Sequence, residues 1–469
     1  MAVSPTTPTD SLWKDIRDSL KGKSRDYTQG SLWRAIIVLS IPMVLEMMMQ
    51  SVFEVVDIFF VGKLGSEAVA AVGITASLLI IVFAIGLGFS LAASAMVARR
   101  IGEKDPDGAA RATWQALVLT VGFGLPAGIL GVIYTPELLG LMGATEEVVR
   151  IGSGYTAVTM GTNLTIILLF LFNAVFRGAG DAGAAMKALW IANLLNIVLD
   201  PMFIFGFGSI PEMGVTGAAV ATTIGRTFGV AYQVWILFGG RSRLHLKKEH
   251  LRIDGIVLRR VLRISGPGIL QYLVGTASWL AMMRIIADFG SDALAGYTIT
   301  IRIIIFALLP SWGISNAAAT LVGQNLGAGH PDRAEKSVWY CTAVDVVFLS
   351  FMGLIFWWNA ETVVRIFVTS PEAIRIGVQS MKMLTAIYPI WAVAMVAVQS
   401  FNGAGDTTTP TWINFFSLWM VQVPLALLFA HYFELSTAGV FGAMMIAQCV
   451  AAATSAYLFK KGKWKTINV

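Results

Sequence analysis

The tetrapeptide Gly178-Ala179-Gly180-Asp181 returns at a 225-residue offset as Gly403-Ala404-Gly405-Asp406. The same offset aligns Pro42 with Pro267 and continues without a gap as far as Ala218. Further pairs at this offset are Gly65-Ser66 with Gly290-Ser291, Ile74-Thr75 with Ile299-Thr300, Trp114 with Trp339, and Arg150-Ile151-Gly152 with Arg375-Ile376-Gly377. A single register held over so long a stretch indicates an internal duplication. The chain is therefore predicted to consist of two copies of one unit.

The composition places both copies in a membrane. Of the 469 residues, 56% are hydrophobic and 13% are charged, whereas an average soluble domain is roughly 25% charged. So few charges exclude a soluble multidomain protein, and so apolar a chain excludes disorder. The apolar residues gather in blocks of 20 or more, each long enough to cross the ~30 Å hydrocarbon core as a helix.

Twelve blocks are predicted to be membrane-spanning helices: 33–61, 68–98, 113–134, 151–175, 185–207, 214–238, 258–286, 293–322, 337–358, 376–400, 410–432 and 437–459. Each copy holds six spans, an even number, so both copies enter the membrane from the same side. The predicted fold is an all-α polytopic membrane protein with two parallel-repeat six-helix bundles. Such a pair suits alternating access, whereas a static channel would show short re-entrant filter segments around a pore.

Lysine and arginine are distributed unevenly between the loops. With the N-terminus inside, the cytoplasmic segments hold 26 of these residues and the external loops hold 4. This bias predicts a multi-pass protein of the cell (inner) membrane with both termini in the cytoplasm. In the N-terminal tail, Leu12, Trp13, Ile16 and Leu20 share one helical side, which predicts a helix lying on the inner membrane face.

The predicted domain limits follow the spans. They are 1–32 for a cytoplasmic amphipathic N-terminal tail, 33–238 for the first bundle (N-lobe), 239–257 for a cytoplasmic linker, 258–459 for the second bundle (C-lobe) and 460–469 for a basic cytoplasmic tail.

Polar residues of the first span mark a candidate site. Spacings of 4, 4 and 3 place four of them in one ~80° stripe of a helix: Glu46, Gln50, Glu54 and Asp57. Acidic groups inside a membrane are costly and usually functional. The alternative for Asp57 is that its carboxylate merely reaches the outer interface.

The fifth span carries a matching face, formed by Asn193, Asn196 and Asp200. Tyr155 in the fourth span and Thr222 in the sixth lie at a similar depth, in the outer half of the bundle. Carboxylate, amide and hydroxyl oxygens together suit a hard monovalent cation such as Na⁺, or a proton shared between close carboxylates. The alternative is that Asp200-Pro201 only terminates a helix.

The duplication supplies a control for this site. At the 225-residue offset its residues Glu54, Asp57, Asn196, Asp200 and Thr222 become Trp279, Met282, Val421, Leu425 and Ala447. The charged residues inside the second copy are read as Arg284, Arg302 and Lys382, so that one lobe is acidic inside and the other basic. The alternative, favoured for Arg284, is that basic residues near the ends of spans only extend their charged groups to the membrane surface. Arg226, one turn after Thr222, is expected to neutralise Glu54 or Asp200, or else to form a purely structural ion pair.

The sequence lacks the motifs that would indicate nucleotide binding, nucleophilic catalysis or a metal site. The sequence contains no G-x-x-x-x-G-K-[ST] phosphate loop, no nucleophile motif in a loop and no metal-ligand spacing among His245, His250, His330 and His431. Cys341 and Cys449 both lie in apolar blocks, which disfavours a disulfide framework. We therefore expect no enzyme activity, no cofactor and no nucleic-acid partner. The 20 Met, 27 Phe and 14 Trp residues provide surfaces suited to lipophilic or cationic small molecules.

The chain resembles the multidrug and toxic compound extrusion (MATE) family over essentially its whole length. The resemblance is carried by Ser40-Ile41-Pro42, Val56-Asp57-Ile58-Phe59-Phe60-Val61-Gly62, Phe176-Arg177-Gly178-Ala179-Gly180-Asp181 and Asn196-Ile197-Val198-Leu199-Asp200-Pro201, the last of which is similar to the DinF-type branch. It implies a V-shaped pair of six-helix bundles that exports drugs by H⁺ or Na⁺ antiport. It also implies an N-lobe cation site at Asp57, Tyr155, Asn196, Asp200 and Thr222.

Glu54 and Arg226 depart from that pattern by adding charges. The C-lobe acids of the NorM-type branch are missing, because Gln271 is the nearest polar residue early in the seventh span. We expect cation uptake at Asp57 and Asp200 to let the first span repack about Pro42, with Pro267 as the matched hinge. The leading hypothesis is a monomeric exporter of small organic molecules, and the alternatives are a lipid-linked saccharide flippase of the same superfamily and a receptor or channel.

Overall fold

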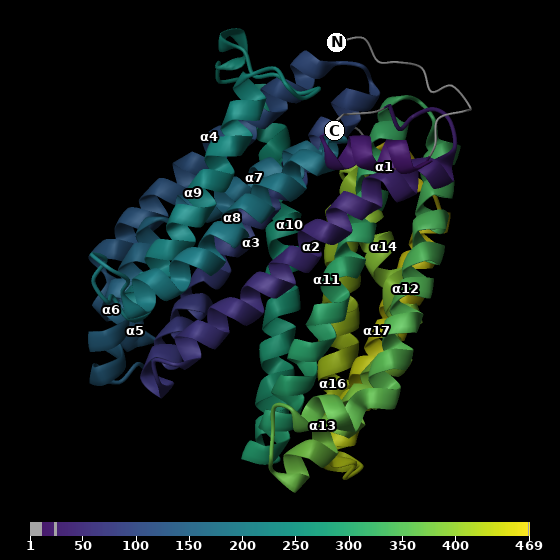
Figure 1. Cartoon of the computed structure of the whole chain (residues 1–469). Helices are drawn as coiled ribbons and strands as arrows, with labels where there is room; N and C mark the ends of the chain where they lie inside the picture. The colour runs from purple at the N-terminus through teal and green to yellow at the C-terminus, as the bar shows by residue number, and fades with distance from the viewer. Residues whose placement is uncertain (1–11, 23–25, 468) are drawn as a thin grey trace.

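The computed structural model describes residues 12–22, 26–467 and 469, so predictions for 1–11, 23–25 and 468 lie outside the described residues. Within the described part of the chain the regular structure is helical, apart from one isolated β-bridge between Phe207 and Ile210. Figure 1 shows two helical bundles that meet at the end carrying α1 (Leu12–Leu20) and the C-terminus, and that diverge toward the other end. We call the end where they meet the closed end.

The N-lobe contains the helices of the first copy. They are α2 (Leu32–Gly62), α3 (Ser66–Gly102), α4 (Pro106–Ile133), α5 (Thr135–Leu141), α6 (Glu146–Gly161), α7 (Asn163–Gly178), α8 (Ala182–Phe205) and α9 (Val215–Phe238). A linker with the short helix η1 (Lys248–His250) leads to the second copy.

The C-lobe repeats this order. Its helices are α10 (Gly255–Ala287), α11 (Ser291–Gly327), α12 (Pro331–Arg365), α13 (Pro371–Ala386), α14 (Tyr388–Ala404), α15 (Thr408–Asn414), η2 (Phe415–Gln422), α16 (Val423–Leu427), η3 (Leu428–Tyr432) and α17 (Ser436–Lys460), followed by η4 (Lys463–Thr466).

The twelve predicted spans are confirmed. Among the described residues, nine helical segments are long and apolar enough to cross a membrane alone, and two bent helix pairs each supply one more span. The remaining span is α9, which is less apolar because it carries polar residues such as Arg226 and Gln233.

Two spans differ from the expectation of continuous helices. The fourth span breaks at Thr162 with a bend of 43° between α6 and α7, and the tenth breaks at Ile387 with a bend of 57° between α13 and α14. The breaks match at the 225-residue offset and share one backbone conformation, with φ −105° at Thr162 and φ −98° at Ile387. Pro389 cannot continue the helix before it, and Asn163 donates from Nδ2 to the Met160 carbonyl (2.6 Å), which competes with regular helical bonding.

The repeated Gly-Ala-Gly-Asp motif ends one helix and starts the next. Its first glycines allow close backbone packing, because a Cβ at Gly178 would lie 2.6 Å from the Ser94 carbonyl oxygen and one at Gly403 would lie 2.2 Å from that of Ala319. Its aspartates cap helices: Asp181 Oδ1 accepts from the Ala184 amide (3.2 Å), which starts α8. In the second copy Asp406 accepts from the Thr409 amide at the start of α15 (3.0 Å).

Glycines also bring the two lobes together at the closed end. A Cβ at Gly102 of α3 would lie 2.0 Å from the Gln324 carbonyl oxygen of α11, and one at Gly327 of α11 would lie 2.1 Å from the Arg99 carbonyl oxygen of α3. At the 225-residue offset Gly327 matches Gly102, and Gln324 matches Arg99. The second contact is therefore the first one with the two copies exchanged. The lobes are therefore related by an approximate two-fold axis that passes between α3 and α11.

The same symmetry extends along the interface. Gly88 of α3 faces the Ser265 carbonyl of α10, where a Cβ would be 3.0 Å away, and Gly313 of α11 faces the backbone of Met43 in α2 at 2.8 Å. In Figure 1, α2 starts beside the C-lobe and runs obliquely to the far end of the N-lobe. The first helix of each lobe thus packs on the other lobe, and each contains an internal proline, Pro42 in α2 and Pro267 in α10.

The N-terminal tail forms the predicted helix in its described part. Helix α1 buries Asp15 and Ser19 against the protein, and Ser19 donates to the Val38 carbonyl of α2 (2.9 Å). Leu12 and Trp13 are exposed, Trp13 to 79%. Leu12 and Trp13 therefore point away from the lobes, as an interfacial helix requires, whereas Ile16 of the same predicted face packs partly against the protein core.

Replacing Gly102 with alanine should weaken the closed end. The added methyl group would meet a backbone carbonyl that cannot move aside, and overpacking of this kind costs about 1–3 kcal/mol. Fluorescence-monitored thermal unfolding of the purified protein should show a lower midpoint for Gly102→Ala. Gly73→Ala, in the same helix but with open space around it, is the matched control, and its unfolding midpoint should not be lower than that of the unmodified protein. Equal midpoints for the two variants would contradict the close packing of α3 and α11.

Candidate functional site

A cavity of about 210 Å³ lies inside the N-lobe, between α2, α3, α6, α7 and α9. Its lining residues are Phe53, Asp57, Val72, Ala76, Leu79, Phe83, Tyr155, Thr159, Thr162, Thr165, Ile166, Ala219, Thr222, Thr223 and Arg226. The wall is apolar with a group of hydroxyls and two opposite charges. Four residues chosen from the sequence therefore meet here: Asp57, Tyr155, Thr222 and Arg226.

Asn196 and Asp200 join this cavity through Thr222. The Asn196 side chain donates from Nδ2 to Thr222 Oγ1 (2.9 Å) and to Asp200 Oδ1 (3.1 Å). Both Asn196 and Asp200 are buried. The other oxygens of this network, Asn196 Oδ1 and Asp200 Oδ2, are buried and accept no hydrogen bond from any described residue. Asp57 lines the same cavity as Thr222, so the two carboxyl groups belong to one site that Thr222 and Asn196 connect.

The arrangement suits a small hard cation. Two carboxylates, an amide oxygen and hydroxyls are the donor types that bind Na⁺, and a proton on either carboxylate would equally relieve their repulsion. The described residues contain no group of three or more His, Cys, Asp or Glu side chains placed to hold a metal ion. A bound Na⁺ would consequently depend on amide and hydroxyl oxygens from Asn196 and Thr222 besides the carboxylates of Asp57 and Asp200.

The helix break at Thr162 adds hydroxyls that sequence reasoning missed. Thr162 and Thr165 line the cavity, and Thr162 Oγ1 shares a hydrogen bond with Thr223 Oγ1 (2.9 Å). A continuous helix was expected here, so nothing suggested that these residues reach the site. The second copy contained a signal for this helix break. Ile387 matches Thr162 at the 225-residue offset, and Pro389, two positions later, cannot continue the preceding helix.

Gln50 and Glu54 lie outside the cavity lining. Gln50 donates from Nε2 to Glu54 Oε1 (3.1 Å), and Asn193 Nδ2 lies 3.5 Å from Gln50 Oε1. The Glu54 side chain is exposed. Arg226 lies over the Phe53 ring at 5.9 Å from its centroid and forms no ion pair within 4.0 Å with a described residue. The expected direct pairing of Arg226 with Glu54 or Asp200 is therefore not formed in this conformation.

Glu46 lies away from the other acids of the stripe on α2. Its carboxylate is fully buried and accepts from Arg177 Nη1 of α7 at 2.7 Å. Arg177 also binds the C-lobe, because its carbonyl accepts from Thr320 Oγ1 of α11 (3.1 Å). Glu46 thus joins α2 to α7 near the contact between the lobes, away from the cavity.

The basic residues assigned to the C-lobe interior lie on its surface in this conformation, and Arg284 behaves as the snorkelling alternative expects. Arg284, Arg302 and Lys382 are all exposed, and Arg284 pairs with Asp288 on its own helix. The C-lobe instead buries an acid, Asp345 of α12, completely. Asp345 lies inside the predicted span 337–358, at the position that matches Thr120, so the survey of charged residues in the second copy overlooked an acid that the sequence already shows. Gln271 of α10 keeps a buried Oε1 with no hydrogen-bond partner among the described residues.

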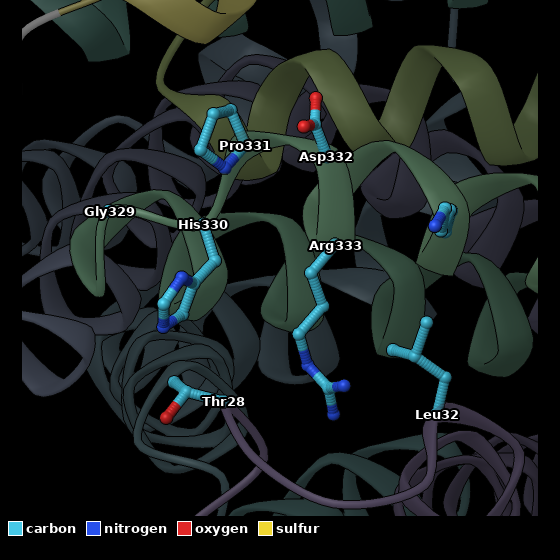
Figure 2. A pocket seen from close by; sticks show the side chains of 8 residues that line it. Thr28, Leu32, Gly329, His330, Pro331, Asp332 and Arg333 are labelled. Carbon is cyan, nitrogen blue, oxygen red and sulfur yellow. The ribbon is translucent and has the colours of Figure 1, made fainter.

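A second hollow lies at the closed end and is unrelated to these residues. It has a volume of about 530 Å³ and is lined by Thr28, Leu32, Gly329, His330, Pro331, Asp332, Arg333 and Lys336 (Figure 2). Arg333 is already engaged there, since its guanidinium donates to the Gly30 carbonyl (2.9 Å) and the Gln29 carbonyl (3.1 Å). This hollow is open and belongs to the docking of the N-terminal segment on α12.

Two matched six-span bundles with a polar cavity inside one of them define a polytopic membrane transporter. The chain belongs to the MatE family. The family model matches it twice, over residues 42–202 and 267–428, and the starts of the two matches reproduce the offset of the internal repeat.

Similar proteins cover nearly the whole chain. The "Probable multidrug resistance protein NorM" of Thermotoga maritima is 28% identical over 441 residues, which are 92% of this chain and 93% of that protein. An outward-facing multidrug resistance MATE family transporter of the MOP superfamily superposes with a TM-score of 0.87 at 26% identity, covering 92% of this chain and 96% of that one. A MOP superfamily transporter from Pyrococcus furiosus Vc1, described as having a binding pocket of reverse polarity, superposes with a TM-score of 0.88 at 25% identity, covering 99% and 100%.

Replacing Glu46 with glutamine should destabilise the protein. Removing one partner of a buried ion pair leaves the other charge uncompensated, at a cost of about 3–5 kcal/mol. Thermal unfolding of Glu46→Gln should show a clearly lower midpoint. Asp288→Asn removes the partner of Arg284 in an exposed pair and serves as the control, with an expected change below about 1 kcal/mol. Equal, small effects would mean that the Glu46–Arg177 pair is not desolvated.

Proposed function

We propose that the chain is a secondary antiporter that exports small organic compounds in exchange for H⁺ or Na⁺ by alternating access. The observation that carries the proposal is the N-lobe cavity, in which Asp57 faces a buried Asn196–Asp200–Thr222 network with unsatisfied oxygens. A transporter that only bound its substrate would have no need for repelling carboxylates inside a membrane, since each is costly to bury. Membership of the MatE family supports the same function.

The driving cation acts by relieving this repulsion. With the site empty, Asp57 and Asp200 oppose each other in surroundings of low dielectric constant, which favours a conformation that admits water to them. A proton or Na⁺ neutralises the pair and lowers the cost of closing the bundle around it. Arg226, which lies over the Phe53 ring and lines the same cavity, contributes a positive charge to it.

Helix α2 links the cation site to the position of the lobes. It carries Asp57, contains Pro42 and packs against α8 of the N-lobe and α11 of the C-lobe. Repacking of α2 about Pro42 on cation binding would therefore shift its contact with α11 and narrow the substrate path. Differential affinity of the cation for the two conformations drives the change, and linkage makes cation and substrate mutually antagonistic.

We further propose that the closed end and both termini lie in the cytoplasm and that the protein resides in the inner membrane of a cell, a topology that the distribution of lysine and arginine supports. In this orientation the two lobes diverge toward the outside (Figure 1), and Asp57 and Asp200 would lie in the outer half of the N-lobe. External cations would then bind while substrate leaves, which is the order that export requires.

Adaptable methionines and flat aromatics in the lobes suit lipophilic and cationic organic substrates. Curated relatives named as multidrug exporters support this class, among them the "Multidrug export protein MepA" of Staphylococcus haemolyticus, 20% identical over 91% of this chain and 93% of that protein. Each lobe packs on the other within one chain, so a monomer suffices for the cycle.

Asp57→Asn and Asp200→Asn should each abolish cation-driven export, because an amide can neither take up a proton nor carry the charge that binds Na⁺. The measurement is dye efflux in everted membrane vesicles under separately imposed proton and sodium gradients. The C-lobe positions that match these acids provide controls, so Met282→Leu and Leu425→Met should retain efflux. Equal loss in all four variants, or efflux insensitive to both gradients, would contradict the proposed function.

The orientation can be tested with single cysteines in two loops. A cysteine at position 212, between α8 and α9, should react with an impermeant maleimide from outside intact cells. A cysteine at position 248, in η1 of the linker, should react only after the cells are permeabilised. Labelling of both from one side would overturn the twelve-span topology.

A further inference from the structure

The C-lobe buries one acid that the proposed cycle does not use. Asp345 lies near the middle of α12, about 21 Å along the helix from Pro331 and about 30 Å from Arg365, and none of its surface is exposed. Its neighbours one turn away on either side, Cys341 and Leu349, are also fully buried and belong to two apolar clusters of the C-lobe core. Asp345 is therefore placed in the dry interior of a membrane-embedded bundle.

Among the residues that the structure describes, Ser311 is the one polar side chain that hydrogen-bonds this carboxyl group. Ser311 Oγ of α11 lies 2.8 Å from Asp345 Oδ2, whereas Asp345 Oδ1 is buried without a hydrogen-bond partner among the described residues. The same Ser311 Oγ lies 3.7 Å from the sulfur of Met395 in α14. A hydroxyl has a single proton, so Ser311 cannot donate to both neighbours at once. A proton on Asp345 resolves this, because the acid then donates to Ser311 Oγ and Ser311 donates to Met395.

No cation is at hand to neutralise an ionised Asp345. The helices packed against α12 are α2, α11, α13 and α14. On them, Arg302 and Lys382 are exposed, and the buried acid of α2, Glu46, pairs with Arg177. Among the described residues, Asp345 forms no ion pair within 4.0 Å.

The remaining titratable groups in the C-lobe interior are neutral in their ordinary forms. They are the Cys341 thiol on α12, the Tyr388 phenol on α14 and the Tyr297 phenol on α11, all buried. A carboxylate in such surroundings would be an isolated buried charge, which costs far more than the protonated acid.

We propose that Asp345 is a proton-binding site of the C-lobe, separate from the N-lobe carboxylates, and that its proton holds α12 to α11 and α14 through Ser311. Ser311 directly follows Pro310, an internal proline of α11 that leaves the helix without one backbone hydrogen bond at this point. Loss of the proton leaves a charge that must be hydrated, so release requires α11 and α12 to part at the Pro310 position. The site accordingly takes up its proton when the C-lobe interior is packed and releases it when this interior opens to water.

The experiment is infrared spectroscopy of the purified full-length protein in lipid bilayers, which detects the carbonyl stretch of protonated carboxyl groups without requiring a known substrate. The wild-type spectrum at neutral pH should contain a protonated-carboxyl band that Asp345→Asn lacks and that disappears reversibly at alkaline pH. Thr342→Val, a buried change one turn away on α12, is the matched control and should keep the band. The double variant Asp57→Asn/Asp200→Asn should also keep it, which separates this site from the proposed cation site of the N-lobe.

Two outcomes would overturn the proposal. An unchanged protonated-carboxyl band in Asp345→Asn would mean that Asp345 is ionised, and a band that persists at every pH at which the protein stays folded would mean that the proton never leaves. If Asp345→Asn fails to fold, Asp345→Glu replaces it, because a glutamic acid should shift the frequency of the band, and an unshifted band would equally refute the assignment. Failure of coupled efflux in the N-lobe variants has no bearing on this result.

Discussion

The backbone contact between α3 and α11 is the constraint on which the rest of the molecule depends. Gly102 faces the Gln324 carbonyl and Gly327 faces the Arg99 carbonyl, so the two lobes touch through main-chain atoms around an approximate two-fold axis. Because no side chain intervenes, this contact is short and rigid. It leaves the opposite ends of the lobes free to diverge into a V (Figure 1), and the cavity lies within the N-lobe arm, between its own helices.

The acids inside the two bundles illustrate three ways of accommodating a carboxyl group within a membrane-embedded protein. Glu46 pairs with Arg177, so its charge is compensated by an ion pair that joins α2 to α7. Asp57 lines the N-lobe cavity, and the Asn196–Asp200 pair joined to it through Thr222 keeps buried oxygens without a partner among the described residues, which suits a cation that binds and leaves. Asp345 has only Ser311, so the proposed solution there is a proton of its own. The role of each acid therefore depends more on the groups that contact its carboxyl group than on its depth in the membrane.

The candidate site could be predicted in large part from helical spacing and the internal repeat. The face shared by Asn196 and Asp200, and the approach of Asp57, Tyr155 and Thr222, follow from helices of known pitch and orientation that pack into one bundle. Glu46 was grouped with the site because it lies on the same stripe as Asp57. The stripe extends over about 16 Å of helix, so its two ends face different neighbours.

The sequence by itself determined the twelve spans, the two parallel copies and the acidic character of the N-lobe site, because apolar length, residue repetition and spacing along a helix are local properties of the chain. Tertiary structure alone decided the bends at Thr162 and Ile387, the pairing of Glu46 with Arg177 and the isolation of Asp345. Each of these depends on which residues from distant helices come within a few ångströms. In a bundle of similar apolar helices, the periodicity of one helix does not specify the neighbour that its polar residues will meet.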